Sequence, residues 1–193
     1  MNDDQPIIGF LHEAGHLKNT PRAGWQLAGI RQPESVAEHS FRVGVIAYVL
    51  ALMEGADENK AAAIALFHDV PEARTTDLHS VAKPWIDVTH DSRVVEQQTA
   101  DLPEPLSAPI RSLIAEFAAK ETLEAKCAKD ADKLECMLQA REYQAQGNHL
   151  VQPWIDTMLG AVMTGSGRRL AEAAVKTAPD AWWHDIVASY GKS

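Results

Sequence analysis

The stretch Ala65-Leu66-Phe67-His68-Asp69 ends an apolar helical run with two adjacent side chains that can bind a metal ion. Two other His-Asp pairs occur, His90-Asp91 and His184-Asp185, but neither follows a long apolar helix. We expect both of these to be structural or surface residues. Candidate partners for the first pair are one histidine and four carboxylates elsewhere in the chain: His39, Glu72, Asp77, Asp130 and Asp132. The first question is therefore whether distant segments bring these groups together around His68-Asp69.

Length and composition predict a single all-α domain. The chain has 193 residues, of which 46% are hydrophobic and 23% are charged, as in soluble globular domains. Alanine is abundant and β-branched runs are few, which favours helix over strand. The formal net charge of -9 argues against a nucleic-acid polymer as the main partner. A small anionic substrate is still compatible, because one metal ion and one or two arginines can reverse the local potential.

Cysteine use and the N-terminal residues predict a cytoplasmic protein without a membrane span. Cys127 and Cys136 fall in one expected helix, too far apart along its axis for a disulfide between them. We expect both to be reduced and buried. The first residues hold no basic segment followed by an apolar run, and we expect no apolar stretch to reach the length of a membrane span.

Apolar periodicity and the positions of proline and glycine predict the order of the helices. We expect a loop over residues 19–33, because this stretch is rich in proline and glycine. The expected helices cover residues 6–18, 35–54, 58–68, 87–102, 106–120, 122–146, 153–163, 168–176 and 180–190. Trp182 and Trp183, in the last of them, are expected to pack on the core or on a second subunit.

The helix over residues 35–54 begins with a recognisable start signal. Ser35 and Glu38 form a capping box, in which each side chain accepts a backbone hydrogen bond at the helix start. Apolar residues then occupy several faces, so we expect this helix to be buried nearly all round. His39 lies in its first turn at the spacing of its apolar neighbours and should point inward.

The long helix over residues 122–146 leaves one ligand undecided. Asp130 shares a face with Leu134 and Met137, whereas Asp132 shares the opposite face with Cys136. Both faces are partly apolar, so either aspartate could be turned inward. Helical periodicity alone does not choose between them.

Imidazole and carboxylate groups together form a ligand set for one divalent cation: Co²⁺, Mn²⁺, Ni²⁺, Fe²⁺, Zn²⁺ or Mg²⁺. An ion held by His39, His68, Asp69 and one further aspartate would keep open positions for water and substrate. Such an ion polarises a phosphoryl oxygen and lowers the pKa of bound water. Glu72, one helical turn after His68, could orient or deprotonate that water. A phosphate substrate would also need a cation on its far side, for which the arginines of residues 19–33 are candidates.

These residues resemble the HD-domain phosphohydrolases, and within them the branch of metal-dependent 5′-deoxynucleotidases. The resemblance extends over residues 11–144. It is carried by residues 17–25 (LKNTPRAGW), 33–40 (PESVAEHS) and 67–69 (FHD), by Glu72, by Asp77-Leu78, and by residues 129–135 (KDADKLE). One departure is Val70-Pro71, which places a proline directly after the metal-binding pair. Residues 150–190 carry no motif and are expected to form C-terminal helices of the same domain.

The resemblance implies an all-α HD-domain bundle that forms a homodimer and binds one metal ion. Its implied ligands are His39, His68, Asp69 and Asp132, with Asp130 as a neighbour. Glu72 would hold the attacking water, and Asp77 would lie against the sugar and disfavour a ribose hydroxyl. Arg22 and Trp25 would contact the phosphate and the nucleoside.

The activity that the resemblance implies is hydrolysis of deoxyribonucleoside 5′-monophosphates to deoxynucleoside and phosphate. Three alternatives are other HD enzymes. They are a cyclic nucleotide phosphodiesterase, a nucleoside triphosphate hydrolase, and a two-metal oxygenase or phosphodiesterase that would need His79 or His90 as further ligands. A nucleotide-sensing module that binds the metal without turnover is the non-enzyme alternative, and the presence of Glu72 argues against it.

Overall fold

The computed structural model describes residues 4–86 and 91–190, and the regular elements in these ranges are helices. A single isolated bridge pairs Pro21 with Ser35. Short 3₁₀ turns cover His16–Asn19, Lys83–Trp85 and His149–Val151. The α-helices are α1 (Gln5–Gly15), α2 (Gly24–Leu27), α3 (Val36–Glu54), α4 (Glu58–Phe67), α5 (Glu72–Thr75), α6 (Asp91–Gln98), α7 (Glu104–Ala119), α8 (Leu123–Ala145), α9 (Gln152–Ala161), α10 (Gly165–Lys176) and α11 (Ala181–Tyr190).

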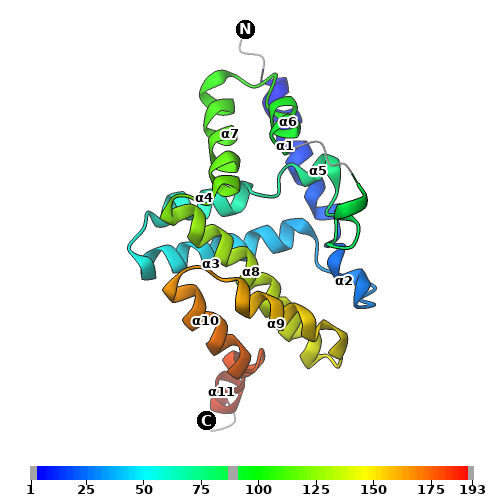
Figure 1. Cartoon of the computed structure of the whole chain (residues 1–193), viewed down its shortest axis with the longest axis vertical. Helices are drawn as coiled ribbons and strands as arrows, with labels where there is room; N and C mark the ends of the chain where they lie inside the picture. The colour runs from blue at the N-terminus through cyan, green and yellow to red at the C-terminus, as the bar shows by residue number, and fades with distance from the viewer. Residues whose placement is uncertain (1–3, 87–90, 191–193) are drawn as a thin grey trace.

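Helices α3, α4 and α8 form the centre of the bundle (Figure 1). Helix α8 crosses the molecule and contacts α3 and α4 on one side and α9 and α10 on the other. Several of its buried side chains are small, such as Ala125, Ala128 and Ala131, so neighbouring helices can approach closely there. The all-α prediction is therefore confirmed for the part of the chain that the structure describes.

The local signals at the ends of α3 and α4 act as the sequence predicts. The Ser35 hydroxyl accepts a hydrogen bond from the Glu38 amide, and the Glu38 carboxylate accepts one from the Ser35 amide at 2.6 Å. Gly55 ends α3 with φ +74°, a left-handed conformation that glycine adopts without strain. Asp57 then caps α4 through the Lys60 amide. These signals fix where α3 begins and ends and where α4 begins.

The prediction that α3 is buried nearly all round is wrong for the single chain. Its inner face, with Val36, Val43 and Leu50, is fully buried, but Phe41 on the outer face is 69% exposed. Apolar residues indicate that a helix face is covered, but they do not show whether the same chain or another molecule covers it. Four more large apolar residues continue the exposed stripe along the helix: Val45, Tyr48, Val49 and Leu52. We call Phe41 and these four residues the α3 outer face.

The expectation that no apolar stretch reaches the length of a membrane span is wrong for α3, which meets that length and composition. The core helix of a globular protein passes the same test. The inner face of α3 packs against α4 and α8 and carries His39 and Arg42 into contacts with α8. These contacts identify α3 as the central helix of this bundle.

Several helix bounds differ from the predicted ones for identifiable reasons. The predicted loop over residues 19–33 contains the single turn α2. Residues 87–90, the start of one predicted helix, lie outside the described ranges, and α6 begins at Asp91. Helix α7 starts earlier than predicted, at Glu104, because Pro105 occupies its first turn, where a missing amide costs nothing.

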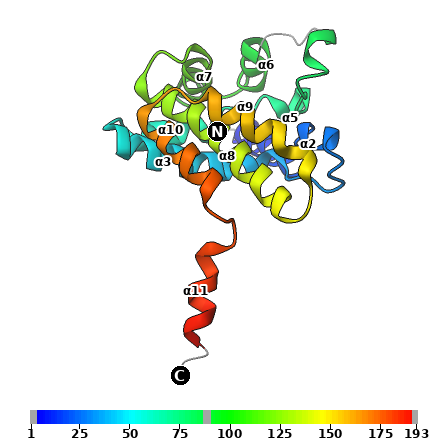
Figure 2. The same cartoon turned by 60° about the horizontal axis from the view of Figure 1, so that its bottom comes forward.

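The last helix stands apart from the bundle. Helix α11 extends away from α10 and ends far from the central helices (Figure 2). Trp182 is 74% exposed and Trp183 is 41% exposed. The expectation that they pack on the core is therefore wrong, while packing on a second subunit stays a prediction.

Candidate metal centre

The His68-Asp69 pair lies in a tight connection between two helices. Helix α4 ends at Phe67, and His68 is its C-terminal cap residue. The Glu72 amide donates to the Asp69 carbonyl at 2.9 Å, which bends the chain directly into α5. Pro71 immediately precedes the first residue of α5, so the proline starts the new helix rather than displacing Glu72.

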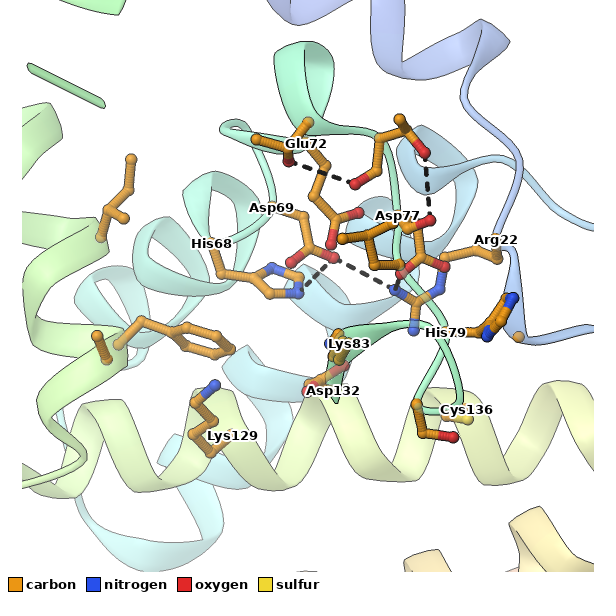
Figure 3. A pocket seen from close by; sticks show the side chains of 18 of the residues that line it. Arg22, His68, Asp69, Glu72, Asp77, His79, Lys83, Lys129, Asp132 and Cys136 are labelled. Atoms are coloured by element: carbon orange, nitrogen blue, oxygen red, sulfur yellow. Dashed lines mark hydrogen bonds and ion pairs between the residues drawn. The ribbon is translucent and has the colours of Figure 1, made fainter. Parts of the chain in front are cut away.

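Ligand atoms of His39, His68 and Asp69 meet beside this connection, and Asp132 joins them through His39. His39 Nε2 lies 3.2 Å from Asp132 Oδ1 and 3.7 Å from Asp69 Oδ2. His68 Nε2 lies 3.0 Å from the same Asp69 oxygen. Ligand atoms roughly 2.0–2.2 Å from one metal ion stand about 3 Å apart, so these separations suit a single ion. Figure 3 shows His68, Asp69 and Asp132 facing the same space.

Hydrogen bonds to the other ring nitrogens fix both imidazoles. Nδ1 of His68 donates to the Ala65 carbonyl at 2.6 Å, and Nδ1 of His39 donates to the Glu135 carboxylate. These bonds orient each ring so that Nε2 points toward the shared space. Metal-binding histidines are oriented in the same way.

The polar atoms that face this space lack hydrogen-bond partners among the described residues. They are His39 Nε2, His68 Nε2, Asp69 Oδ2 and Glu72 Oε2, and all four are buried. Buried polar atoms without partners are costly unless an ion or ligand satisfies them. Ligand atoms of His39, His68 and Asp69 also lie within 4.8 Å of one another. The donor set therefore fits one divalent cation bound by nitrogen and oxygen.

The electrostatics of the cluster favour a bound positive charge. Burial and Arg22 lower the pKa of His39, but the neighbouring carboxylates of Asp132 and Glu135 outweigh them and raise it to about 10. Burial raises the pKa of Asp69, but His68 and Arg22 outweigh burial and lower it to about 2. Burial raises the pKa of Asp132, but the neighbouring His39 outweighs burial and lowers it. The two aspartates are therefore carboxylates ready to bind a cation.

The two aspartates of α8 point in different directions. Asp130 is fully buried on the side of α10 and accepts hydrogen bonds from the Met163 and Thr164 amides, both at 2.7 Å. The Thr164 hydroxyl adds a third bond at 2.7 Å. Asp132 faces His39 instead. The geometry thus separates two residues that periodicity had left equivalent, and only Asp132 lies beside the histidines.

Arg22 borders the cluster and is already engaged by carboxylates. Its Nη1 lies 3.5 Å from Asp69 Oδ2 and 3.7 Å from Asp77 Oδ1. Burial would lower the pKa of Arg22, but these carboxylates raise it beyond its usual range. Asp77 also accepts a hydrogen bond from the Ala23 amide at 2.8 Å, which ties the loop after α5 to the segment before α2.

Trp25 lies at the base of the same region but is only 2% exposed. Its indole N–H donates to Glu34 at 2.9 Å, and its ring packs against Tyr143 and Trp154. Contact with a ligand is therefore limited to the ring, because the N–H is already used.

Glu72 holds its proton unusually tightly in the absence of a cation. Burial raises its pKa, repulsion by Asp69 and Asp77 raises it further, and the result is about 9. Figure 3 shows its side chain beside Asp69 and Asp77, at the edge of the candidate metal centre. A carboxyl group in this environment has a high affinity for a proton released by water.

Sequence reasoning missed Glu135, which orients the His39 ring from the side opposite the candidate metal. It is fully buried, accepts the Nδ1 proton of His39, and receives two hydrogen bonds from Arg42 at 2.8 and 3.0 Å. Burial raises its pKa, but His39 and Arg42 outweigh burial and lower it. Glu135 lies three residues after Asp132, a spacing that places both on one helix face and could have identified it.

Sequence reasoning also missed Lys129, three residues before Asp132. Its ammonium nitrogen lies 3.4 Å from the centroid of the Phe117 ring and borders the same cavity. Burial lowers the pKa of Lys129 to about 8, although Asp132 acts in the opposite direction. The cavity that Lys129, Arg22 and the candidate ligands line has a volume of roughly 1380 Å³.

In the part of the chain that the structure describes, no further histidine lies beside His39 and His68 to bind a second metal. His79 lines the cavity, but its Nδ1 accepts the Ala82 amide at 3.1 Å. His90 lies outside the described residues. His184 is exposed and pairs with Asp180 on α11 at 2.9 Å. In the described ranges, the imidazoles beside Asp69 are those of His39 and His68.

A helical bundle with a His, His-Asp and Asp cluster defines a recognised class of protein. The HD domain family model matches residues 14–174, and this chain belongs to that family. The 5′-deoxynucleotidase HDDC2 of Bos taurus is 32% identical over 140 residues, which cover 72% of this chain and 68% of the relative. The 5′-deoxynucleotidase hdd1 of Schizosaccharomyces pombe is 34% identical over 148 residues, covering 74% of each chain.

A solved structure agrees with the assignment to this fold. A conserved hypothetical protein from Pyrococcus furiosus superposes with a TM-score of 0.72 at 29% sequence identity. The match covers 88% of this chain and 99% of that protein. The predicted HD-domain bundle is therefore confirmed.

Proposed function

We propose that this protein is a metal-dependent 5′-deoxynucleotidase that releases phosphate from deoxyribonucleoside 5′-monophosphates. One observation carries the proposal: ligand atoms of His39, His68 and Asp69 lie within 4.8 Å of one another, Asp132 lies 3.2 Å from His39, and Glu72 lines the same cavity beside Asp69 (Figure 3). The relatives named 5′-deoxynucleotidase, at 32% and 34% identity, support the same activity.

One divalent cation is the proposed cofactor, held by His39, His68, Asp69 and Asp132. Such a cation supplies polarisation of the phosphoryl group and a lowered pKa of water. The two nitrogen and two oxygen donors suit Co²⁺, Mn²⁺, Ni²⁺, Fe²⁺, Zn²⁺ or Mg²⁺. Glu135 keeps the His39 ring oriented by accepting its Nδ1 proton.

Glu72 is the proposed proton-transfer residue. As water attacks phosphorus, its carboxylate accepts one water proton, and the phosphorus–O5′ bond breaks. The leaving O5′ oxygen then needs a proton, which the Glu72 carboxyl group returns. The surroundings that raise its pKa, namely burial and the neighbours Asp69 and Asp77, favour the accepting step.

Arg22, Trp25 and Asp77 are the proposed substrate contacts. Arg22 would face the phosphate, and Trp25 would present its ring to the nucleoside. Asp77 is held in place by the Ala23 amide and lies on the Arg22 side of the cavity. A fixed carboxylate at that position would leave little room for a 2′-hydroxyl group, which gives a preference for deoxyribose.

The first experiment measures phosphate release from dAMP, dCMP, dGMP and TMP, and from the ribonucleotides AMP, CMP, GMP and UMP, with Co²⁺ or Mn²⁺ added. We expect at least about a tenfold preference for the deoxy series, which corresponds to about 1.4 kcal/mol. In Asp77→Ala, removal of the carboxylate should reduce this preference to about threefold or less. Asp77→Asn is the matched control, because it keeps the size of the side chain and should keep most of the preference.

Equal wild-type rates on both nucleotide series would contradict the role given to Asp77. A protein that releases no phosphate from any monophosphate, with any of the metals, would contradict the proposed activity itself.

The α3 outer face supports a homodimer, which we propose as the working form of the protein. The face is continuous, exposed and apolar, and patches of this kind mark contact surfaces in soluble proteins. Both cysteines are free and buried, which suits the reducing cytoplasm as the proposed location. The proposed partners are thus a second copy and a deoxynucleotide rather than a nucleic-acid polymer or a membrane.

A charge in the centre of the α3 outer face should separate the subunits. We expect Val45→Glu to shift the protein from dimer to monomer in light scattering after gel filtration, since an unpaired buried charge opposes association. Leu150→Glu is the matched control, because Leu150 is also exposed but lies in the turn before α9. A wild-type protein that is monomeric at micromolar concentration would contradict the homodimer.

A further inference from the structure

The cavity that would bind the proposed phosphate substrate is lined by more carboxylate side chains than cationic side chains without a carboxylate partner. Asp69, Glu72, Asp77 and Asp132 all border the cavity, and one metal ion offsets only part of their charge. Arg22 is the cation that sequence reasoning assigned to the phosphate. Its guanidinium already lies within 4 Å of Asp69 and Asp77, so these carboxylates neutralise much of its charge. A dianionic phosphate therefore needs another cation.

Lys129 is placed to supply that charge. It precedes Asp132 by one turn of α8, so both side chains lie on the helix face that borders the cavity. In Figure 3, Lys129 lies on the His68 side of the site and Arg22 lies on the Asp77 side. The Phe117 ring supports the ammonium group and itself packs against His68, with a centroid distance of 4.6 Å.

The partner of Lys129 is an aromatic ring rather than a carboxylate. Among the described residues, the ion pairs within 4 Å involve other cations, including Arg22, Arg42, Lys60 and Arg74. A cation–π contact fixes the position of an ammonium group without cancelling its charge, and it is worth about 0.5–2 kcal/mol. A phosphate oxygen forms a stronger, charge-assisted hydrogen bond. The ammonium group is thus held near the site while its charge stays available.

We propose that Lys129 is a phosphate-binding residue, whose ammonium group contacts the phosphoryl oxygens on the side of the site opposite Arg22. The inference rests on the proposed phosphomonoesterase function and adds a second cationic contact to it. Lys129 and Arg22 would hold the phosphate from two sides, which restrains its orientation as the phosphorus–O5′ bond breaks. The chemical class of ligand that this arrangement recognises is a phosphomonoester or free phosphate.

The test compares Lys129→Gln and Lys129→Arg with the wild type and with Lys126→Gln. Lys126 lies on the same helix but does not line the cavity, so it controls for loss of one positive charge from α8. Binding of inorganic phosphate to the Mn²⁺-loaded protein is measured by calorimetry. We expect Lys129→Gln to weaken binding about 10- to 100-fold, the effect of losing one hydrogen bond to a charged group. Lys129→Arg should stay within about fivefold of wild type, and Lys126→Gln within about twofold.

Steady-state kinetics on a deoxynucleoside monophosphate provide the second measurement. A phosphate contact made by the bound substrate raises KM when it is lost, and one that strengthens at the transition state also lowers kcat. Melting temperature and Mn²⁺ content of each variant show whether the fold and the metal centre are intact. If Lys129→Gln does not fold, the same comparison is made with Lys129→Met, which keeps the apolar stem against Phe117.

Two outcomes would overturn the inference. One is a folded, Mn²⁺-loaded Lys129→Gln protein that binds inorganic phosphate within twofold of wild type. The other is a loss of affinity as large in Lys126→Gln as in Lys129→Gln, which would reduce the effect to overall charge. Phosphate binding is measured without turnover, so its result does not depend on catalytic activity. A wild-type protein that hydrolyses no monophosphate would contradict the proposed function and leave the result on Lys129 unchanged.

Discussion

Replacing Asp132 with asparagine should abolish both metal binding and phosphomonoesterase activity. The carboxylate lies 3.2 Å from His39 Nε2 among the candidate ligands, and a neutral amide binds divalent cations more weakly. We expect activity to fall by about three orders of magnitude or more, since the metal contributes several kcal/mol and each 1.36 kcal/mol is about tenfold. Metal content after gel filtration and the rate of phosphate release measure the two effects separately.

Asp130→Asn is the matched comparison, two residues away on the same helix. This carboxylate accepts three hydrogen bonds at the start of α10 and faces away from the histidines. We expect the variant to lose about 1–3 kcal/mol of stability, because a buried charge-assisted bond is weakened. Its melting temperature should fall by about 2–4 °C per kcal/mol, while metal content stays near wild type. Metal loss in Asp130→Asn with retention in Asp132→Asn would reverse the assignment of the fourth ligand.

Replacing Glu72 with glutamine should produce a protein that is inactive but still binds metal. Glutamine keeps the size of the side chain and removes the proton acceptor. We expect kcat to fall about 10²- to 10⁴-fold, the usual contribution of a general base. Metal content should be unchanged, because the nitrogen and oxygen ligands of the centre come from other residues.

Glu96→Gln is the control for this substitution. Glu96 also lines the cavity, but it is exposed on α6. Its rate should stay within about threefold of wild type. A Glu72→Gln protein that keeps near-wild-type kcat with saturating substrate would show that water is activated by the metal alone.

The sequence predicted the features that depend on local chemistry. The Ser35 capping box, the Gly55 stop and the Asp57 cap all appear in the structure, because each is decided within one helical turn. His39 is buried as its position in the first turn of α3 indicated. The HD-domain resemblance supplied the long-range arrangement, which periodicity alone does not contain.

Features that depend on tertiary contacts were harder to predict. Asp130 and Asp132 could not be told apart, because both faces of α8 are buried, one against α10 and the other against α3 and α4. The α3 outer face looked like core for a related reason: its composition does not show what lies against it. Glu135 and Lys129 were overlooked, although each is one helical turn from Asp132.

The hydrogen bonds that Asp130 accepts from Met163 and Thr164 limit how far the chain can be shortened from its C-terminal side. The motifs end near residue 144, so a fragment of that length would contain every proposed catalytic residue. It would also lose the Met163 and Thr164 donors and leave the Asp130 carboxylate without them, on the helix that presents Asp132 to the metal. We therefore expect the smallest active fragment to include the C-terminal helices through α10. A boundary chosen from the motifs alone would remove the support of the helix that carries the fourth ligand.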